Sequence, residues 1–401
     1  MREYLLTILT AAMITYLLTP AVRLFAIWFG AQAPVRDRDV HAIPTPRLGG
    51  LAMFGGLIGA LLVASRLPKL SGVFQSSGAA RGLLLASALI VVIGIADDRW
   101  ELDALTKFAG QVAAAGLLIM NGVQLLWLPM PNGVPLSLPP EYGVPLTVFI
   151  VVATINAVNF VDGLDGLAAG TVGIAACALF SYSYLLSATN HMSRLMGATL
   201  ITAILIGVCL GFLPHNFNPA RIFMGDTGSM LIGLLLASST IMLTGQFDTS
   251  MIGTYDLFPV FVPILLVPAV VAIPFMDMVF AVWRRANQGR SPFAPDKLHL
   301  HHRLLDLGHS HRRAVLIMYF WVGLLASWVV EFALAKNIGH VLSLSRPLVV
   351  TVSFSVTCLV AALGVVVMIA LPRIHTRRAV REVTAPVHPL DPARQPASTR
   401  N

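Results

Sequence analysis

Aspartates stand at the ends of several long apolar stretches of this sequence. Asp97 and Asp98 end one stretch, Asp162 and Asp165 follow another, and Asp226 precedes a third, each beside glycine, asparagine or a second aspartate. A single aspartate in such a place is most simply a helix cap or a stop signal. Several carboxylates gathered on one face would repel one another unless a cation lay among them, and hard oxygen ligands suit Mg²⁺ or Mn²⁺.

An amide-rich segment precedes Asp162. Asn156, Asn159 and Asp162 recur every three residues, so neighbouring pairs share a face if the segment is helical. Amides at the end of an apolar helix need partners, which could be a neighbouring helix, a metal or a sugar nucleotide. Gly163 and Gly166 permit a sharp loop whose backbone N–H groups could bind a ligand.

Cationic residues provide a second kind of candidate site. Lys107 lies within an apolar stretch, where it could either snorkel to the interface or contact a phosphate. His299, His301, His302 and Arg303 form a dense cluster. The first two histidines are two residues apart and no cysteine is near, so a phosphate site fits this cluster better than zinc, with a solvated basic loop as the alternative.

A smaller basic group lies near the N-terminus. Arg36, Arg38, His41 and Arg47 could contact lipid headgroups or a phosphorylated ligand. Together with oxygen ligands for Mg²⁺, these cations indicate phosphoryl transfer, in which a protein mainly positions groups and neutralises charge.

The composition requires a membrane as the setting for this chemistry. The chain has 401 residues, of which 56% are hydrophobic and 11% charged, whereas a soluble domain carries roughly 25% charged residues. The net charge of the chain is +8. In a membrane protein such a charge usually comes from Lys and Arg in the cytoplasmic loops, so it does not by itself indicate nucleic-acid binding. The three cysteines lie in apolar runs without metal-ligand spacing, so we expect them to be packing residues.

The elements that position these residues are membrane-spanning helices, each needing roughly 20 apolar residues. We therefore expect an all-α polytopic membrane protein with a single catalytic domain over 1–371 and a polar tail without fixed structure over 372–401. Asn132-Gly133 favours a short external hairpin near 129–145. Asp277 has no assigned role. The sequence predicts eleven spans, at 4–28, 48–66, 81–97, 104–122, 144–161, 167–187, 195–213, 228–245, 258–282, 314–336 and 347–371.

The distribution of Lys and Arg predicts the orientation of these spans. With the N-terminus outside, the inner loops and the tail carry 18 Lys and Arg residues and the outer segments carry 7. Such a bias places the N-terminus outside and the C-terminus in the cytoplasm. The aspartates and the histidine cluster then all lie on the cytoplasmic face.

Four segments, taken in order, resemble the signature motifs of one enzyme group. DDRWELDALTKFAGQ, NAVNFVDGLDGLAAG, FMGDTGS and HLHHR resemble those of the polyprenyl-phosphate N-acetylhexosamine-1-phosphate transferase superfamily, glycosyltransferase family 4. HLHHR is similar to the pattern of its WecA branch, which uses UDP-GlcNAc. TPRLGGLAMF and the segment from HLHHR onward look most like actinobacterial members.

The resemblance implies a reaction in the bacterial plasma membrane, with the active site on the cytoplasmic face. GlcNAc-1-phosphate would pass from UDP-GlcNAc to undecaprenyl or decaprenyl phosphate, as the first membrane step of a cell-envelope polysaccharide such as lipopolysaccharide or arabinogalactan. Mg²⁺, with Mn²⁺ as a substitute, is the implied cofactor. The implied partners are UDP-GlcNAc, the polyprenyl phosphate and the bilayer, without nucleic acid; a homodimer is an open option.

The resemblance also implies roles for the candidate residues. Asp226 and Asn159 would hold the metal, and the catalytic residues would be Asp97, Asp98 and Lys107. Asp97 would act on the attacking lipid phosphate as a base or an orienting group, Asp98 would lie beside it near the metal, and Lys107 would contact phosphate. The implied nucleotide, diphosphate and sugar contacts are Asn156, Asp162, Asp165, Phe223, His299, His301, His302 and Arg303, and the lipid-phosphate or headgroup candidates are Arg36, His41 and Arg47.

Two alternatives remain at this point. An MraY-like phospho-MurNAc-pentapeptide transferase would carry out the same chemistry on another sugar nucleotide, and HLHHR argues against it. A secondary transporter would also use intramembrane carboxylates, but we would expect those near the middle of the bilayer.

Overall fold

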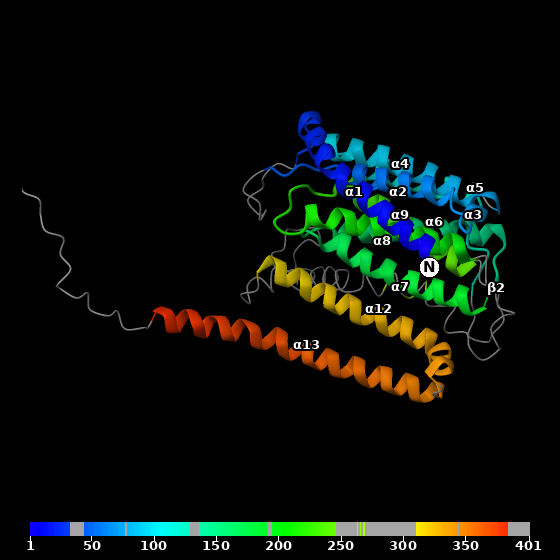
Figure 1. The fold of residues 1–401 in the computed structure, drawn as a ribbon. Coiled ribbons are helices and arrows are strands. Elements are labelled where there is room, and N and C mark those ends of the chain that lie inside the picture. The colour runs from blue at the N-terminus through cyan, green and yellow to red at the C-terminus, as the bar shows by residue number, and fades with distance from the viewer. Residues whose placement is uncertain are drawn as a thin grey trace, which may run out of the picture.

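The computed structural model is almost entirely helical (Figure 1). It describes residues 1–32, 44–76, 78–128, 136–190, 195–245, 310–342 and 345–383, together with the single positions 263, 265 and 268. The helices are α1 (Arg2–Phe29), α2 (Gly49–Ala64), α3 (Ser71–Ser76), α4 (Ala79–Trp100), α5 (Ala104–Met120), α6 (Pro140–Val161), α7 (Leu167–Asn190), α8 (Met196–Asn216), α9 (Gly225–Gly245), α12 (His311–Leu342) and α13 (Arg346–Val383).

The predicted spans coincide with long apolar helices. Among the described residues, eight helices are long and apolar enough to cross a membrane, and α2 and α5 are shorter apolar helices. These ten match ten of the eleven predicted spans, which confirms an all-α polytopic membrane protein. The span at 258–282, which contains Asp277, lies outside the described residues. The total of eleven and the orientation therefore stay predictions.

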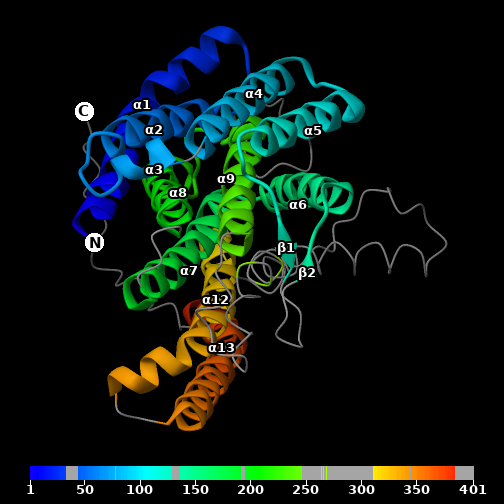
Figure 2. The same ribbon diagram turned by 90° about the vertical axis from the view of Figure 1, so that its right-hand side faces the viewer.

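Helix α9 is the centre of the bundle and is buried from Thr227 to Gly245. It packs against α4, α6, α8 and α2, which surround it in Figure 2. Small residues permit this close approach. A Cβ atom on Gly94 of α4 would lie 2.4 Å from Thr227 Cα, and one on Gly50 of α2 would lie 2.2 Å from Gly228 N. Neither glycine can be replaced without moving α9.

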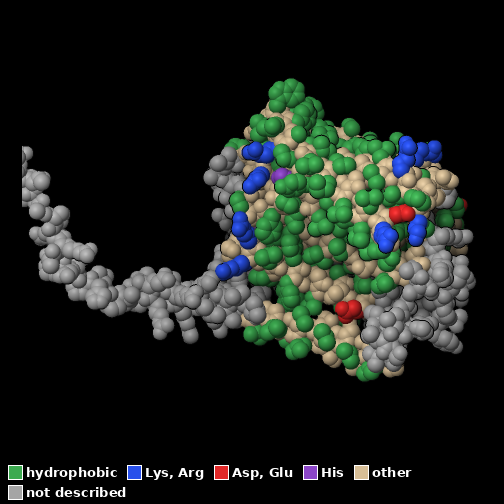
Figure 3. Space-filling view, viewed as in Figure 1, with side chains coloured by type: hydrophobic (Ala, Val, Ile, Leu, Met, Phe, Trp, Pro, Cys, Tyr) green, Lys and Arg blue, Asp and Glu red, His purple; other side chains and the backbone are tan. Residues whose placement is uncertain are grey.

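The outer helices expose apolar side chains, as lipid-facing helices do. The most peripheral helix, α13, packs on α12. Only 6% of the residues in its most apolar 18-residue stretch are buried. In the face shown in Figure 3, green apolar side chains cover the middle of the bundle, while Lys and Arg gather towards its two ends. This banding fits helices that cross a bilayer.

The ends of several helices differ from the prediction. Helix α4 continues to Trp100, α8 to Asn216, and α9 begins at Gly225. Asp97 and Asp98 therefore lie inside the last turn of α4, because both find polar partners and need not terminate the helix. Helix α13 is drawn to Val383, beyond the predicted span end at 371, and Arg, Ala and Glu in this segment favour helix; the absence of fixed structure in the tail stays a prediction.

The predicted hairpin is formed by two short strands, while its external position stays a prediction. β1 (Trp127–Leu128) pairs antiparallel with β2 (Leu136–Ser137), and the connecting residues 129–135 lie outside the described part. The indole Nε1 of Trp127 donates to the Gly245 carbonyl at 3.1 Å, which places the hairpin against the C-terminal end of α9. Helix α6 begins at Pro140 and so occupies the last part of the segment predicted as hairpin.

Candidate active site

The site begins with a capping interaction between α4 and α9. Asp98 accepts hydrogen bonds from Asp226 N at 2.9 Å, from Thr227 N at 3.1 Å and from Thr227 Oγ1 at 2.6 Å. Its side chain thus satisfies N–H groups at the start of α9, where a negative charge also suits the helix dipole. Gly225, with φ +67°, brings the chain close enough, because a Cβ there would lie 2.4 Å from Asp98 Oδ2. Asp98 therefore positions Asp226.

Lys107 joins the two remaining carboxylates of this end. Its Nζ lies 2.7 Å from Asp97 Oδ2 and 3.0 Å from Asp226 Oδ2. Asp97 is further fixed by the Leu102 N–H, which donates to Oδ1 at 2.9 Å. The cation that the clustered aspartates require is thus supplied in this structure by Lys107. Lys107 pairs with two carboxylates in this structure, and its predicted contact with phosphate stays a prediction.

The two asparagines of α6 face different neighbours. Asn159 Nδ2 donates to Asp226 Oδ1 at 3.1 Å and to Ser229 Oγ at 2.9 Å, so it belongs to the carboxylate cluster. Asn156 Nδ2 donates to Gln111 Oε1 at 2.6 Å. Asn156 therefore makes the helix–helix hydrogen bond that was one of the sequence alternatives.

Asp162 caps the C-terminal end of α6, beside this cluster. Burial and the negative charges of Asp226 and Asp98 raise the pKa of its carboxyl to about 8, while Arg47 acts in the opposite direction. Arg47 is thus near enough to influence Asp162, and its backbone N–H donates to the Ala31 carbonyl. The segment before α2 therefore lies at the same end as the aspartates.

The loop between α6 and α7 is held by the loop between α8 and α9. Asp165 Oδ2 accepts from Asn218 Nδ2 at 2.9 Å and from Ala220 N at 3.0 Å. Gly166 N donates to Asn216 Oδ1 at 3.0 Å. Only 5% of Asp165 is exposed, so its carboxylate is largely committed to holding this loop.

Helix α12 fastens the same pair of loops. The Tyr319 hydroxyl donates to the Gly166 carbonyl, and Arg312 Nε donates to the Asn218 carbonyl at 2.6 Å. The tyrosine ring lies so close to Gly170 that a Cβ there would be 2.0 Å from Cζ. The start of α12 is therefore at the same end of the bundle as the aspartates.

Phe223 precedes Asp226 by three residues. Its backbone N–H donates to the Pro46 carbonyl at 2.8 Å, and its carbonyl accepts from Gly49 N at 3.0 Å. The residue thus links the α8–α9 loop to the start of α2, with a partly buried side chain. His299, His301, His302, Arg303, Arg36 and His41 lie outside the described residues.

The structure adds residues that sequence reasoning did not single out. Thr227 and Ser229 complete the contacts of Asp98 and Asn159, and Gln111 binds Asn156. A signal for them existed, because all three lie within the quoted motifs. Arg312 lies in the segment that begins at HLHHR but was not singled out there, and no such segment includes Tyr319.

The polar groups of this cluster suit a hard divalent cation. Asp226 and Asp97 supply carboxylate oxygens around the positive charge of Lys107, and Asn159, whose Nδ2 now donates to Asp226, would bind a metal through its amide oxygen after a turn of the side chain. Over the described ranges, no group of three or more His, Cys, Asp or Glu side chains is arranged to hold a metal. Mg²⁺ typically takes one or two carboxylates and completes its shell with water and substrate phosphates, so the residues fit a substrate-assisted site.

Comparison with known proteins identifies the family. Residues 80–244 match the model of glycosyl transferase family 4. The chain is 50% identical over 329 residues, 81% of each protein, to the decaprenyl-phosphate N-acetylglucosaminephosphotransferase of Mycobacterium tuberculosis (strain ATCC 25618 / H37Rv).

More distant relatives cover a similar part of the chain. The undecaprenyl-phosphate alpha-N-acetylglucosaminyl 1-phosphate transferase of Escherichia coli O157:H7 is 31% identical over 332 residues, 80% of this chain and 83% of the relative. The phospho-N-acetylmuramoyl-pentapeptide-transferase of Desulforudis audaxviator is 32% identical over 359 residues, which are 82% of this chain and 97% of the relative. This chain belongs to glycosyl transferase family 4.

Proposed function

We propose that this protein transfers GlcNAc-1-phosphate from UDP-GlcNAc to decaprenyl phosphate. The observation that carries the proposal is the 50% identity, over 81% of both chains, to proteins named for this transfer. An oxygen of the lipid phosphate attacks the β-phosphorus of UDP-GlcNAc. The bond from that phosphorus to the bridging oxygen breaks, and UMP leaves with this oxygen, so that decaprenyl-diphosphate-GlcNAc remains in the membrane.

The Asp97–Lys107–Asp226 cluster is our proposed phosphoryl-transfer centre. Lys107 can turn from the carboxylates to a substrate phosphate, because its side chain is 29% exposed. Asp97, held by the Leu102 N–H, orients the lipid phosphate; little proton abstraction is needed from a group that is largely ionised near neutral pH. Mg²⁺, or Mn²⁺ in its place, would be held by Asp226 and Asn159 and would neutralise the diphosphate.

The nucleotide is proposed to lie against the neighbouring loops. Phe223 would stack on uracil, and Asn156 and Asp162 would shape the pocket. Asp165 would act through the loop that it holds, because Oδ2 already accepts two hydrogen bonds. The remaining proposed contacts are His299, His301, His302 and Arg303 for the diphosphate and sugar, and Arg36, His41 and Arg47 for the lipid phosphate.

We further propose that this end of the bundle faces the cytoplasm of a bacterial plasma membrane. The excess of Lys and Arg in the loops at this end supports that side. A water-soluble nucleotide and a membrane-bound phosphate could then meet without either crossing the bilayer. The position of the carboxylates at the ends of α4, α6 and α9 disfavours a secondary transporter, for which a site near mid-membrane is expected.

A sugar-nucleotide exchange tests the substrate. Purified protein is supplied with decaprenyl phosphate, Mg²⁺ and either UDP-GlcNAc or UDP-MurNAc-pentapeptide, and lipid products are analysed by mass spectrometry. We expect decaprenyl-diphosphate-GlcNAc and UMP from the first mixture only. Product from the pentapeptide substrate alone would show an MraY-like enzyme, and uptake of a solute by proteoliposomes without any lipid product would indicate a transporter.

A further inference from the structure

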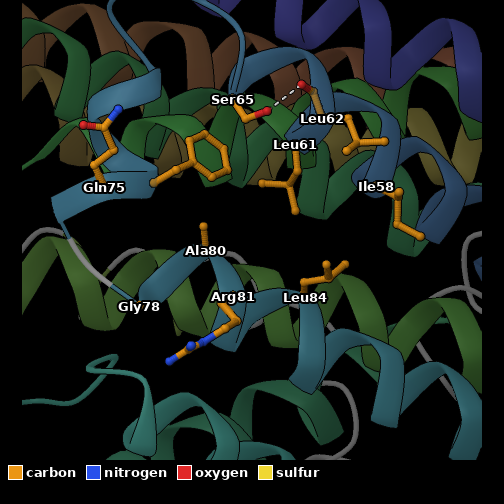
Figure 4. Close-up of a pocket in the computed structure, with 10 residues that line it drawn as sticks. Ile58, Leu61, Leu62, Ser65, Gln75, Gly78, Ala80, Arg81 and Leu84 are labelled. Atoms are coloured by element: carbon orange, nitrogen blue, oxygen red, sulfur yellow. Dashed lines mark hydrogen bonds between the residues drawn. The ribbon is translucent and has the colours of Figure 1, made fainter.

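A cavity lies at the end of the bundle opposite the aspartates. It has a volume of about 550 Å³ and is bounded by the C-terminal part of α2, by α3 and by the start of α4 (Figure 4). That volume is within the range of roughly 300–1,000 Å³ that is typical of sites for small ligands. Nothing in the proposed transfer reaction uses this cavity.

The cavity is too far from the carboxylate cluster to hold a reacting phosphate. Arg81 lines it at the first turn of α4, whereas Asp97 lies in the last turn of the same helix. Sixteen residues of α-helix separate these two positions by roughly 24 Å, which is most of the thickness of a hydrocarbon core. The cavity and the proposed active site therefore lie in opposite leaflets.

The lining is apolar inside and polar at the margin. Figure 4 shows Leu61 and Leu62 of α2 facing Ala80 and Leu84 of α4 across the space. Leu62 is 64% exposed, so the cavity is continuous with a lipid-facing surface. Ser65, Gln75 and Arg81 provide the polar margin. An apolar chamber with a polar edge at the end of a span fits a lipid acyl chain and its headgroup.

The charge at this margin favours an anionic headgroup. Residues 58–85 carry three cations, Arg66, Lys69 and Arg81, and no acid. The acid that reaches this region from the start of α1, Glu3, already accepts hydrogen bonds from the backbone N–H groups of Lys69 and Leu70. Arg81 Nε donates to Asn121 Oδ1 at 3.1 Å, so the exposed guanidinium turns from α4 towards the end of α5 and lies at the edge of the cavity, not inside it (Figure 4).

We propose that this cavity binds an anionic phospholipid, with an acyl chain between α2 and α4 and the phosphate at Arg81. The acyl chain packs against the apolar lining, and the Arg81 guanidinium pairs with the lipid phosphate as a charge-assisted hydrogen-bond donor. Arg66 and Lys69 contribute only to the local potential, because neither lines the cavity.

Native mass spectrometry tests the site directly. Purified full-length protein is delipidated in mild detergent and titrated with phosphatidylglycerol or phosphatidylcholine, and bound lipids are counted. We expect a preference for phosphatidylglycerol that falls about fivefold in Arg81→Gln, the effect expected of one cation near an anionic lipid. The matched control Arg66→Gln should keep the preference. An equal loss in both variants would show diffuse attraction and overturn the proposal.

Filling the cavity gives an independent test. Ala80→Trp, or Ala80→Leu if the tryptophan variant is not monodisperse, should lose the tightest-bound lipid of either type. Undiminished binding in a folded variant would place the lipid elsewhere. Displacement of phosphatidylglycerol by equimolar decaprenyl phosphate would identify the carrier's tail as the occupant and also overturn the proposal. None of these readouts depends on transferase activity.

Discussion

The contact between Asp98 and the start of α9 predicts how two adjacent aspartates differ in function. The change to test is Asp98→Asn, which keeps the size of the side chain but removes its charge and one acceptor oxygen. If the remaining oxygen keeps both bonds from Thr227, the N–H of Asp226 loses its acceptor, because Asp98 is that acceptor in the structure. Asp98 is only 6% exposed, so water cannot readily take the place of the lost acceptor oxygen.

The expected cost follows from these contacts. An unpaired buried N–H costs about 1–3 kcal/mol, and loss of a charge at a helix N-terminus costs about 0.3–1 kcal/mol. We therefore expect Asp98→Asn to lower the free energy of unfolding, measured by SDS titration in mixed micelles, by about 1–4 kcal/mol. Activity should fall together with this stability, because Asp98 positions the proposed metal ligand Asp226.

Thr227→Val supplies the matched control. It removes the hydroxyl that donates to Asp98 Oδ2 and should cost about 1 kcal/mol. The double variant should cost less than the sum of the two single changes, because they disrupt one network. An Asp98→Asn protein of unchanged stability that needs much more Mg²⁺ would refute the capping role and make Asp98 a metal ligand.

Three further changes test neighbouring parts of the site. Lys107→Met leaves two carboxylates without their cation and should lower kcat by about 10²-fold or more; an unchanged rate would return the lysine to a snorkelling role. Gly225→Ala forces a side chain into a left-handed conformation against Asp98, so thermal unfolding and activity should both decline, and wild-type behaviour would contradict the close approach. Tyr319→Phe removes the hydroxyl that holds the Gly166 carbonyl and should raise KM for UDP-GlcNAc about fivefold with little change in kcat; a fall in kcat alone would argue against loop positioning.

The positions of the helices were predictable because hydropathy dominates them. Ten predicted spans coincide with helices in the part of the chain that is described. The ends were less predictable, since a charged residue can stay in a helix when it finds a partner. Asp97 and Asp98 illustrate this, because each accepts hydrogen bonds within the folded protein.

The division of roles between these two aspartates could not be predicted from sequence spacing. Consecutive residues of an α-helix point about 100° apart, so one carboxylate meets Lys107 of α5 and the other meets the start of α9. Which one meets which helix depends on how α4 is rotated in the bundle. The same holds for Tyr319, whose contact with Gly166 joins residues that are 153 positions apart.

The most direct test of the proposed phosphoryl-transfer centre is the Mg²⁺ titration of Asp226→Ala. Wild-type and variant protein are reconstituted with decaprenyl phosphate and UDP-GlcNAc, and released UMP and the lipid product are measured as Mg²⁺ is raised. We expect saturable Mg²⁺-dependent product from the wild type and none from an Asp226→Ala protein that still inserts and runs as one species. Full Mg²⁺-dependent activity in that variant would contradict the assignment of this cluster as the centre of the reaction.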